Sequence, residues 1–208
     1  MQLKVNGQAI DITIETEKTV GDILKAFENE IAKNDATTVS ISLNGKEIGA
    51  SDFDAILAEP LTETTDIALS VISKGEIIHS FASLAQDFAL LTERLSDIPV
   101  LLQSGKDKEA SAIIIEVASK YNAFCHTARM STLFPDVYSK ITADDKASSE
   151  FFKDLLPVLT DFEEAMKGKD SVTMGDIAEY ELKPRLQTIS DALAVFVSEE
   201  GKDVTARQ

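Results

Sequence analysis

The spacing of the apolar residues changes once along this chain, near residue 76, and that change constrains the fold more than any other feature. Up to Lys74 the apolar residues alternate with polar ones in short runs, which is typical of strands that are buried on one face. After Glu76 they recur every three to four residues, which is typical of amphipathic helices. The sequence therefore predicts an α+β protein with two domains, a strand-rich one over residues 1–75 and an all-α one over residues 76–208.

The first domain shows an order of elements that can be read from turns and periods. Two Asn-Gly pairs, Asn6-Gly7 and Asn44-Gly45, indicate tight hairpin turns. Thr19 and Asp22 resemble a capping box with Asp in place of Glu, so a helix is expected to follow. The predicted order is strand, strand, helix, strand, short helix, strand, defined by Leu3, Val5, Ile10, Ile12, Ile14, Val20, Ile23, Leu24, Phe27, Ile31, Val39, Ile41, Leu43, Phe53, Ile56, Leu57, Ile67, Leu69 and Val71.

That order, with a hairpin leading into one helix, resembles the ubiquitin-like β-grasp fold. The stretch Val39–Ile48 is similar to the strand-turn-strand of the small sulfur-carrier branch of that superfamily. The resemblance covers residues 1–75 and implies a ubiquitin-like β-grasp domain. Carriers and modifiers of this kind react through the carboxylate of a free Gly-Gly end, whereas here a single glycine, Gly75, is followed by the rest of the chain. A carrier-derived module fused to a helical regulatory domain is therefore an alternative to the adaptor proposed below.

The open face of the predicted sheet is mostly polar. If Leu3, Ile41 and Leu69 point inward, Ile72 is the large apolar residue that remains on the outer face. Ile72 is therefore a candidate partner-binding residue. The alternatives are a solvated face and a face packed on the helical domain.

The second domain carries apolar stripes that predict an antiparallel four-helix bundle made of two helical hairpins. Gly-Lys-Asp turns at 105–107 and 168–170 join the helices of each pair, with Gly expected in the left-handed position and Asp at the next helix start. Beyond Glu199 no apolar period continues, so a frayed tail is expected. The stripes and the prolines that interrupt them are Phe81, Leu84, Phe88, Leu91, Leu95, Ile98, Pro99, Leu102, Ala110, Ile113, Ile114, Val117, Tyr121, Phe124, Cys125, Ala128, Phe152, Leu155, Pro157, Leu159, Phe162, Met166, Ile177, Pro184, Leu186, Ile189, Leu193 and Phe196.

A longer connection between the two hairpins, from Ser131 to about Lys146, carries aromatic residues where polar ones are usual. Phe134 and Tyr138 are candidate partner-binding residues in this connection. The alternative is that they form a plug over the open end of the bundle.

Charge excludes several classes of partner. The chain has 20 Lys and Arg against 36 Asp and Glu, a net charge of −16. Nucleic-acid binders need clustered cations to displace counterions from phosphates, so nucleic acid is excluded as a partner. Anionic membranes are excluded for the same reason, and no apolar run reaches the roughly 20 residues that cross a bilayer. The N-terminus lacks a basic segment followed by an apolar one, and we expect a cytoplasmic protein.

Residues that usually carry catalysis or hold metals are scarce or badly spaced. His79 lies far from His126, and Cys125 is adjacent to His126, so that on a helix their side chains point about 100° apart. Cys125 also lies on an apolar stripe, where cysteine is usually an inert core residue. The carboxylates at positions 176–181 fit a solvated helix face. We expect no enzymatic activity, no cofactor and no metal site.

These observations favour a non-enzymatic adaptor or chaperone-like protein that binds a protein partner through the bundle, the β-grasp surface or both. An amphipathic helix in a groove between bundle helices is one mode, and another copy of the chain is one candidate partner. A more specific alternative is an export or assembly chaperone, because the paired helices and acidic charge are similar to those of flagellin-type export chaperones.

Overall fold

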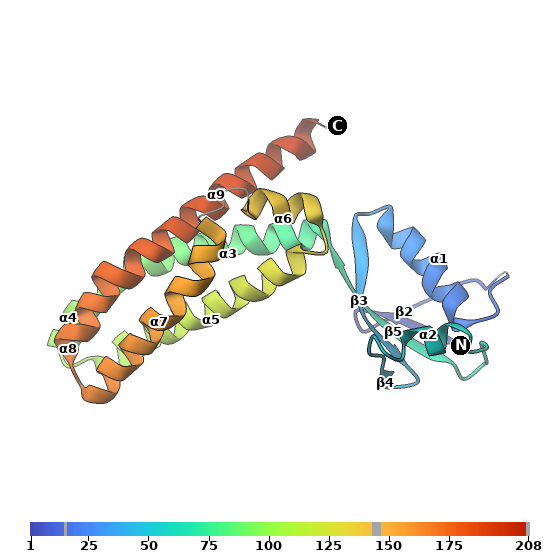
Figure 1. The fold of residues 1–208 in the computed structure, drawn as a ribbon, viewed down its shortest axis with the longest axis horizontal. Coiled ribbons are helices and arrows are strands. Elements are labelled where there is room, and N and C mark those ends of the chain that lie inside the picture. The colour runs from blue at the N-terminus through green and yellow to red at the C-terminus, as the bar shows by residue number, and fades with distance from the viewer. Residues whose placement is uncertain (15, 143–146, 207–208) are drawn as a thin grey trace. The chain divides into compact units, whose positions relative to one another are not determined.

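The computed structural model describes residues 1–14, 16–142 and 147–206 (Figure 1). The chain divides into two compact units, Met1–Glu76 and Ile77–Gln208. The first unit contains a five-stranded sheet and the second is mostly helical, so the predicted α+β class is confirmed.

The sheet of the first unit has a parallel pair at its centre. Its strands are β1 (Gln2–Val5), β2 (Gln8–Ile10), β3 (Ala36–Leu43), β4 (Lys46–Glu47) and β5 (Asp66–Ser73), in the order β2-β1-β5-β3-β4. The β1–β5 pair is parallel, and the other neighbours are antiparallel. A parallel pair needs a crossover, which the intervening helices supply.

Both predicted hairpin turns form on their Asn-Gly pairs. Asn6 and Gly7 have φ angles of 49° and 81°, and Asn44 and Gly45 have φ angles of 53° and 80°. Two consecutive positive φ angles define the turn whose twist matches that of the flanking strands, and Asn followed by Gly tolerates them best.

Helix α1 (Val20–Ala32) covers the core of this unit. The Thr19 side chain accepts a hydrogen bond from the Asp22 amide while the Asp22 carboxylate accepts from the Thr19 amide, so the predicted capping box is confirmed. Helix α2 (Phe53–Leu57) adds Ile56 to the core. The buried apolar residues are Leu3, Val20, Ile23, Leu24, Leu43, Ile56, Ile67 and Leu69.

The second predicted strand is shorter than the alternation suggests. β2 ends at Ile10, whereas the pattern predicts a strand through Ile14; Ile12 and Ile14 are 38% and 44% exposed. The ladder ends because Ile10 lies opposite Leu3, and β1 begins one residue earlier, at Gln2.

In its described residues the helical unit has four long helices and several short ones. They are α3 (Lys74–Leu95), α4 (Ile98–Gln103), α5 (Asp107–Ser131), α6 (Pro135–Thr142), α7 (Ala147–Gly168), α8 (Ser171–Asp176), the π-helix η1 (Ile177–Leu182) and α9 (Lys183–Ala206). Phe81 of α3 makes edge-to-face contacts with Phe124 of α5 and Phe196 of α9, with ring centroids 6.3 and 5.7 Å apart. These rings hold three of the long helices around one core.

The prolines and glycines of this unit differ in part from the predictions. Pro99 lies in the first turn of α4, whereas Pro157 lies inside α7, which begins at Ala147 and continues through the proline. Burial of Leu155 and Val158 on either side of the proline holds the helix together there. Pro184 follows the π-helix η1. This local bulge accommodates a proline, which cannot donate a backbone hydrogen bond to the preceding turn.

The second turn uses a different residue from the one expected. Gly105 takes the left-handed conformation with φ of 70°, but in the second turn Lys169 does so with φ of 55°. Gly168 is instead the last residue of α7. Asp170 then caps α8 by accepting a hydrogen bond from the Thr173 amide, as expected for a helix start.

Two segments expected to be irregular are helical. The connection after Ser131 contains α6, because Pro135 occupies a first-turn position where its missing amide costs nothing. The tail expected to fray from about residue 199 continues α9 to Ala206, and Glu200 is 3% exposed and pairs with Lys140 of α6. Residues 143–146 and the side chain of Phe152, for which loop and core positions are predicted, lie outside the part that the structure describes.

Candidate functional site

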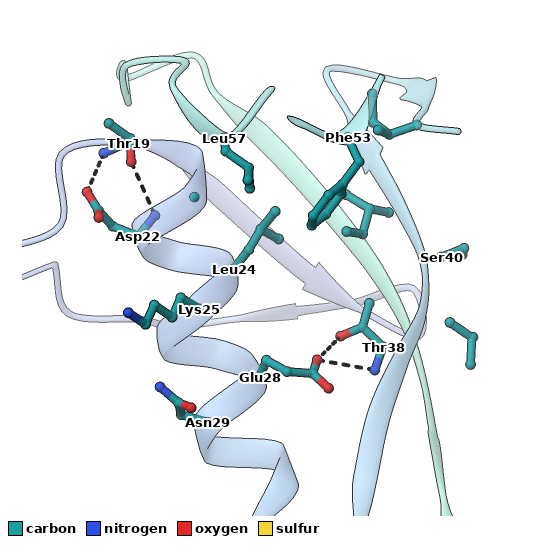
Figure 2. Close-up of a pocket in the computed structure, with 14 residues that line it drawn as sticks. Thr19, Asp22, Leu24, Lys25, Glu28, Asn29, Thr38, Ser40, Phe53 and Leu57 are labelled. Carbon is teal, nitrogen blue, oxygen red and sulfur yellow. Dashed lines mark hydrogen bonds between the residues drawn. The ribbon is translucent and has the colours of Figure 1, made fainter. Parts of the chain in front are cut away.

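The first unit contains a groove of about 730 Å³ between α1, β3 and α2, called here the α1–β3 groove (Figure 2). One wall is α1, the other is the middle of β3, and α2 closes one end. Its lining residues are Thr19, Gly21, Asp22, Leu24, Lys25, Glu28, Asn29, Thr38, Val39, Ser40, Ile41, Ile48, Phe53 and Leu57.

The interior of the groove is apolar. Figure 2 shows Leu24 and Phe53 pointing into the space between α1 and β3, with Leu57 beside them. Leu24 belongs to the buried core, whereas Phe53 is 38% exposed and Val39 is 40% exposed. Side chains of this size gain roughly 25 cal/mol for each Å² of apolar surface removed from water, so they favour a ligand that covers them.

The closed end depends on a glycine. A Cβ atom at Gly21 would lie 2.7 Å from the backbone carbonyl oxygen of Leu57, well inside contact distance. Only glycine therefore allows the first turn of α1 to approach α2 this closely. The same close approach sets the distance between Leu57 and α1, which forms one wall of the groove.

Glu28 joins the two walls. Its carboxylate accepts hydrogen bonds from the hydroxyl groups of Thr37 and Thr38, each 2.8 Å long, and from the Thr38 amide at 3.3 Å. Figure 2 shows this side chain reaching from α1 to β3. The carboxylate thereby fixes the distance between α1 and β3, and it covers the Thr38 amide at the edge of the strand.

The edge of β3 that faces the groove is only partly paired. β4 pairs with Ser42 and Leu43, and the Ile48 amide donates to the Ile41 carbonyl oxygen. Within the described residues no strand pairs with the stretch 36–40 on the side away from β5. A bulge between Thr38 and Ser40 shifts the register of β3 at Val39. Unpaired strand edges present backbone donors and acceptors to a ligand.

The two carboxylates of the groove, Asp22 and Glu28, accept structural hydrogen bonds. Backbone amides of Lys18 and Thr19 donate to Asp22 and hold the pKa of its carboxyl below the usual range. Figure 2 shows Lys25 on the far side of α1, directed away from β3. The arrangement can bury apolar side chains and hydrogen-bond to a backbone, and its lining offers no paired acid and base.

The residues singled out from sequence occupy other places. Ile72 is half-buried on β5, where it alternates with the core-packed Val71 and lies opposite Thr37. Phe134 is buried beside the fully buried Val137, which favours the plug over a docking role for that ring. Tyr138 of α6 is 42% exposed.

The groove itself was not predicted from sequence. Val39 and Phe53 follow the apolar pattern of a strand and of a short helix, so they are expected in the core. The bulge at Val39 and the short length of α2 expose them instead. No local signal separates these residues from core positions, since Phe53 and Ile56 are three residues apart and lie on the same face of a helix.

Sites considered for redox or metal chemistry do not assemble among the described side chains. Burial raises the pKa of the half-buried Cys125 thiol, which hydrogen-bonds to Tyr121, and His126 next to it is exposed. No group of three or more His, Cys, Asp or Glu side chains in the described part of the chain is placed to hold a metal ion. None of the helices described there has the length and apolar character needed to span a bilayer.

Comparison with known proteins divides the chain at the same junction as the structure. The model of the family described as Domain of unknown function (DUF8042) matches residues 76–192, more than half of the chain. The chain belongs to this family. A second model, the TP0873 N-terminal domain, matches residues 1–73. The DUF8042 match thus covers most of the helical unit, and the α1–β3 groove lies in the preceding domain.

A relative shows the same extent. An uncharacterized protein of Treponema pallidum (strain Nichols) is 28% identical over 193 residues, which cover 93% of this chain and 96% of the relative. The similarity therefore spans most of both the N-terminal domain and the DUF8042 region. No solved structure matches this chain.

Proposed function

We propose that this member of the DUF8042 family is a non-enzymatic adaptor that binds a protein partner in the α1–β3 groove. The observation that carries the proposal is the pair of partly exposed side chains, Val39 and Phe53, in a groove that also has an unpaired strand edge. Convergent apolar groups with a few polar anchors are typical of binding sites. The carboxylates Asp22 and Glu28 support binding over catalysis, because both already accept structural hydrogen bonds.

A β-grasp assignment for the first unit is part of this proposal. Its support is the element order, in which the β1–β2 hairpin leads into α1 and the last strand, β5, lies beside β1 in the sheet. In this proposal the first unit acts by presenting a surface to another protein. Gly75 lies in the first turn of α3, a position that speaks against the carrier alternative, whose chemistry needs a free Gly-Gly end.

A four-helix bundle is the corresponding proposal for the second unit. Helices α3, α5, α7 and α9 have 22, 25, 22 and 24 residues, and α7 contacts both α5 and α9. The bundle supplies a rigid second surface, and Val195 of α9 is 60% exposed on it. An adaptor of this design joins two partners or holds one at two places.

Two matched variants test which unit binds. Val39→Asp and Val195→Asp place the same charge on an exposed valine, one in the groove and one on α9. Each full-length variant and the wild type are used for affinity capture from the native cell, followed by identification of the bound proteins. Retained amide signals from β1 and β5 show that the first unit is folded in both variants.

The adaptor proposal predicts that a defined partner is captured by the wild type and by Val195→Asp but not by Val39→Asp. Capture that is unchanged by Val39→Asp contradicts binding in the groove. Loss of capture with Val195→Asp alone assigns the partner to the helical unit, which is the result predicted by the chaperone alternative.

A further inference from the structure

The free edge of β3 defines the conformation that a ligand in the α1–β3 groove must have. The stretch 36–40 has β5 on one side and no strand on the other, within the described part of the chain. A strand rises about 3.3 Å per residue, so this open edge is about 16 Å long. An extended peptide can extend the sheet here, whereas a helix satisfies its own backbone and leaves the edge unpaired.

Glu28 shows which way the edge faces. Its carboxylate accepts from the Thr38 amide, so this backbone donor is directed into the groove and away from β5. The bond measures 3.3 Å, longer than the 2.8 Å bonds from the Thr37 and Thr38 hydroxyl groups to the same carboxylate. A carboxylate oxygen thus occupies the position from which the carbonyl oxygen of an added strand would accept, so a ligand strand has to displace it from the Thr38 amide.

The side chains of the groove fit alternate residues of a strand. Successive side chains of an extended peptide point to opposite sides. A strand laid along β3 would place every second side chain against Leu24 and Phe53, and the others toward solvent. The partly exposed Val39 lies on the bulge beside this path.

The negative charge of the first unit indicates which residues should flank the apolar run of the ligand. Residues 1–75 carry 6 basic and 13 acidic groups. Asp22, Glu28 and Lys25 line the groove, and the exposed Asp54 follows Phe53. The side chain of Lys25 is directed away from β3 (Figure 2), so the two carboxylates are the charges between the walls. This field attracts Lys and Arg, and it repels a second copy of the same acidic chain.

We propose that the α1–β3 groove binds an extended segment of a partner protein, in which apolar residues alternate with polar ones and Lys or Arg flanks the apolar run, as a strand added to the free edge of β3. This inference rests on the proposed function and specifies its binding mode.

Selection from displayed random peptides of about ten residues, the upper length of common strands, identifies such ligands. The full-length wild type is the target, and Val39→Asp removes peptides that bind elsewhere. We expect enriched sequences with apolar residues two positions apart and with basic flanks. Enrichment of apolar residues at spacings of three and four, or of acidic flanks, overturns the proposal, as does failure to enrich any peptide over Val39→Asp.

Backbone methylation of an enriched peptide tests strand addition directly. In one series the odd amides are N-methylated and in the other the even amides, because only alternate amides of an added strand face β3. One series should weaken binding by about tenfold or more and the other much less, as expected for the loss of two backbone hydrogen bonds. Equal effects in the two series overturn strand addition.

The outcomes separate the binding mode from the function. If peptides bind the groove but the two methylated series behave alike, the adaptor proposal stands and strand addition fails. If the cellular partner is captured equally by the wild type and by Val39→Asp, the proposed function fails, whatever the peptides do.

Discussion

Replacing Gly21 with alanine tests the close approach of α1 and α2 that shapes the groove. The new Cβ would be 2.7 Å from the Leu57 carbonyl oxygen, so the backbone must move by about 0.7 Å to reach ordinary contact near 3.4 Å. Overpacking of this kind costs about 1–3 kcal/mol, against a helix-propensity gain of at most about 1 kcal/mol. We expect Gly21→Ala to destabilise the first unit by about 1–2 kcal/mol, which lowers its urea midpoint by about 1 M or more.

Gly75→Ala is the matched control for this change. Gly75 is also the second residue of its helix and belongs to the same unit, but a Cβ there would meet only the Ser73 hydroxyl at 4.0 Å. We expect it to be neutral or stabilising by up to about 1 kcal/mol. The unfolding of each variant is followed by the amide signals of β1 and β5, since Tyr121, Tyr138 and Tyr180 all report on the helical unit. Equal stability of the two variants would refute the reasoning.

Three further predictions concern the core and the titrating groups. Phe88→Ala should cost the helical unit about 3–5 kcal/mol, because Phe88 is fully buried against Phe124; a loss below about 1 kcal/mol in urea unfolding followed by tyrosine fluorescence contradicts this packing. Hydrogen bonds from the amides of Lys18 and Thr19 lower the pKa of the Asp22 carboxyl, so their stabilising effect is complete above the ordinary value of 3.8 and is lost as the pH falls through the lower pKa of the folded protein. Asp22→Asn should remove this part of the acid dependence of the urea midpoint, and an unchanged dependence refutes the assignment. Burial raises the pKa of the Tyr121 hydroxyl to about 12. Because the unfolded chain then loses this proton more readily than the folded protein, stability should fall as the pH rises above 10. Tyr121→Phe should abolish the step near pH 12 in an absorbance titration of the folded protein.

Local chemistry explains why much of the fold could be predicted from the sequence. The Asn-Gly turns and the capping box at Thr19 are determined by a few adjacent residues, and the structure contains them where the sequence places them. The change from alternation to helical spacing near residue 76 reflects burial on one side of a strand or a helix, and it corresponds to the α+β architecture.

Features that depend on distant partners could not be predicted. The strand expected through Ile14 stops at Ile10, which pairs with Leu3, because β1 extends just one residue further, to Gln2. The tail beyond Glu199 stays helical although its apolar period ends. Glu200 forms an ion pair with Lys140, which lies in a different helix, α6, and this distant partner cannot be read from the local sequence. The bulge in β3 at Val39, beside the groove, also follows from no local sequence pattern.

Hydrogen exchange of the full chain, free and bound to the partner captured by the wild type, tests the central claim most directly. The account predicts slower exchange of the amides at 38–41 of β3 and of the facing part of α1, with little change on α9. Protection confined to the helical unit, with the β3 edge exchanging as in the free protein, would contradict binding in the α1–β3 groove.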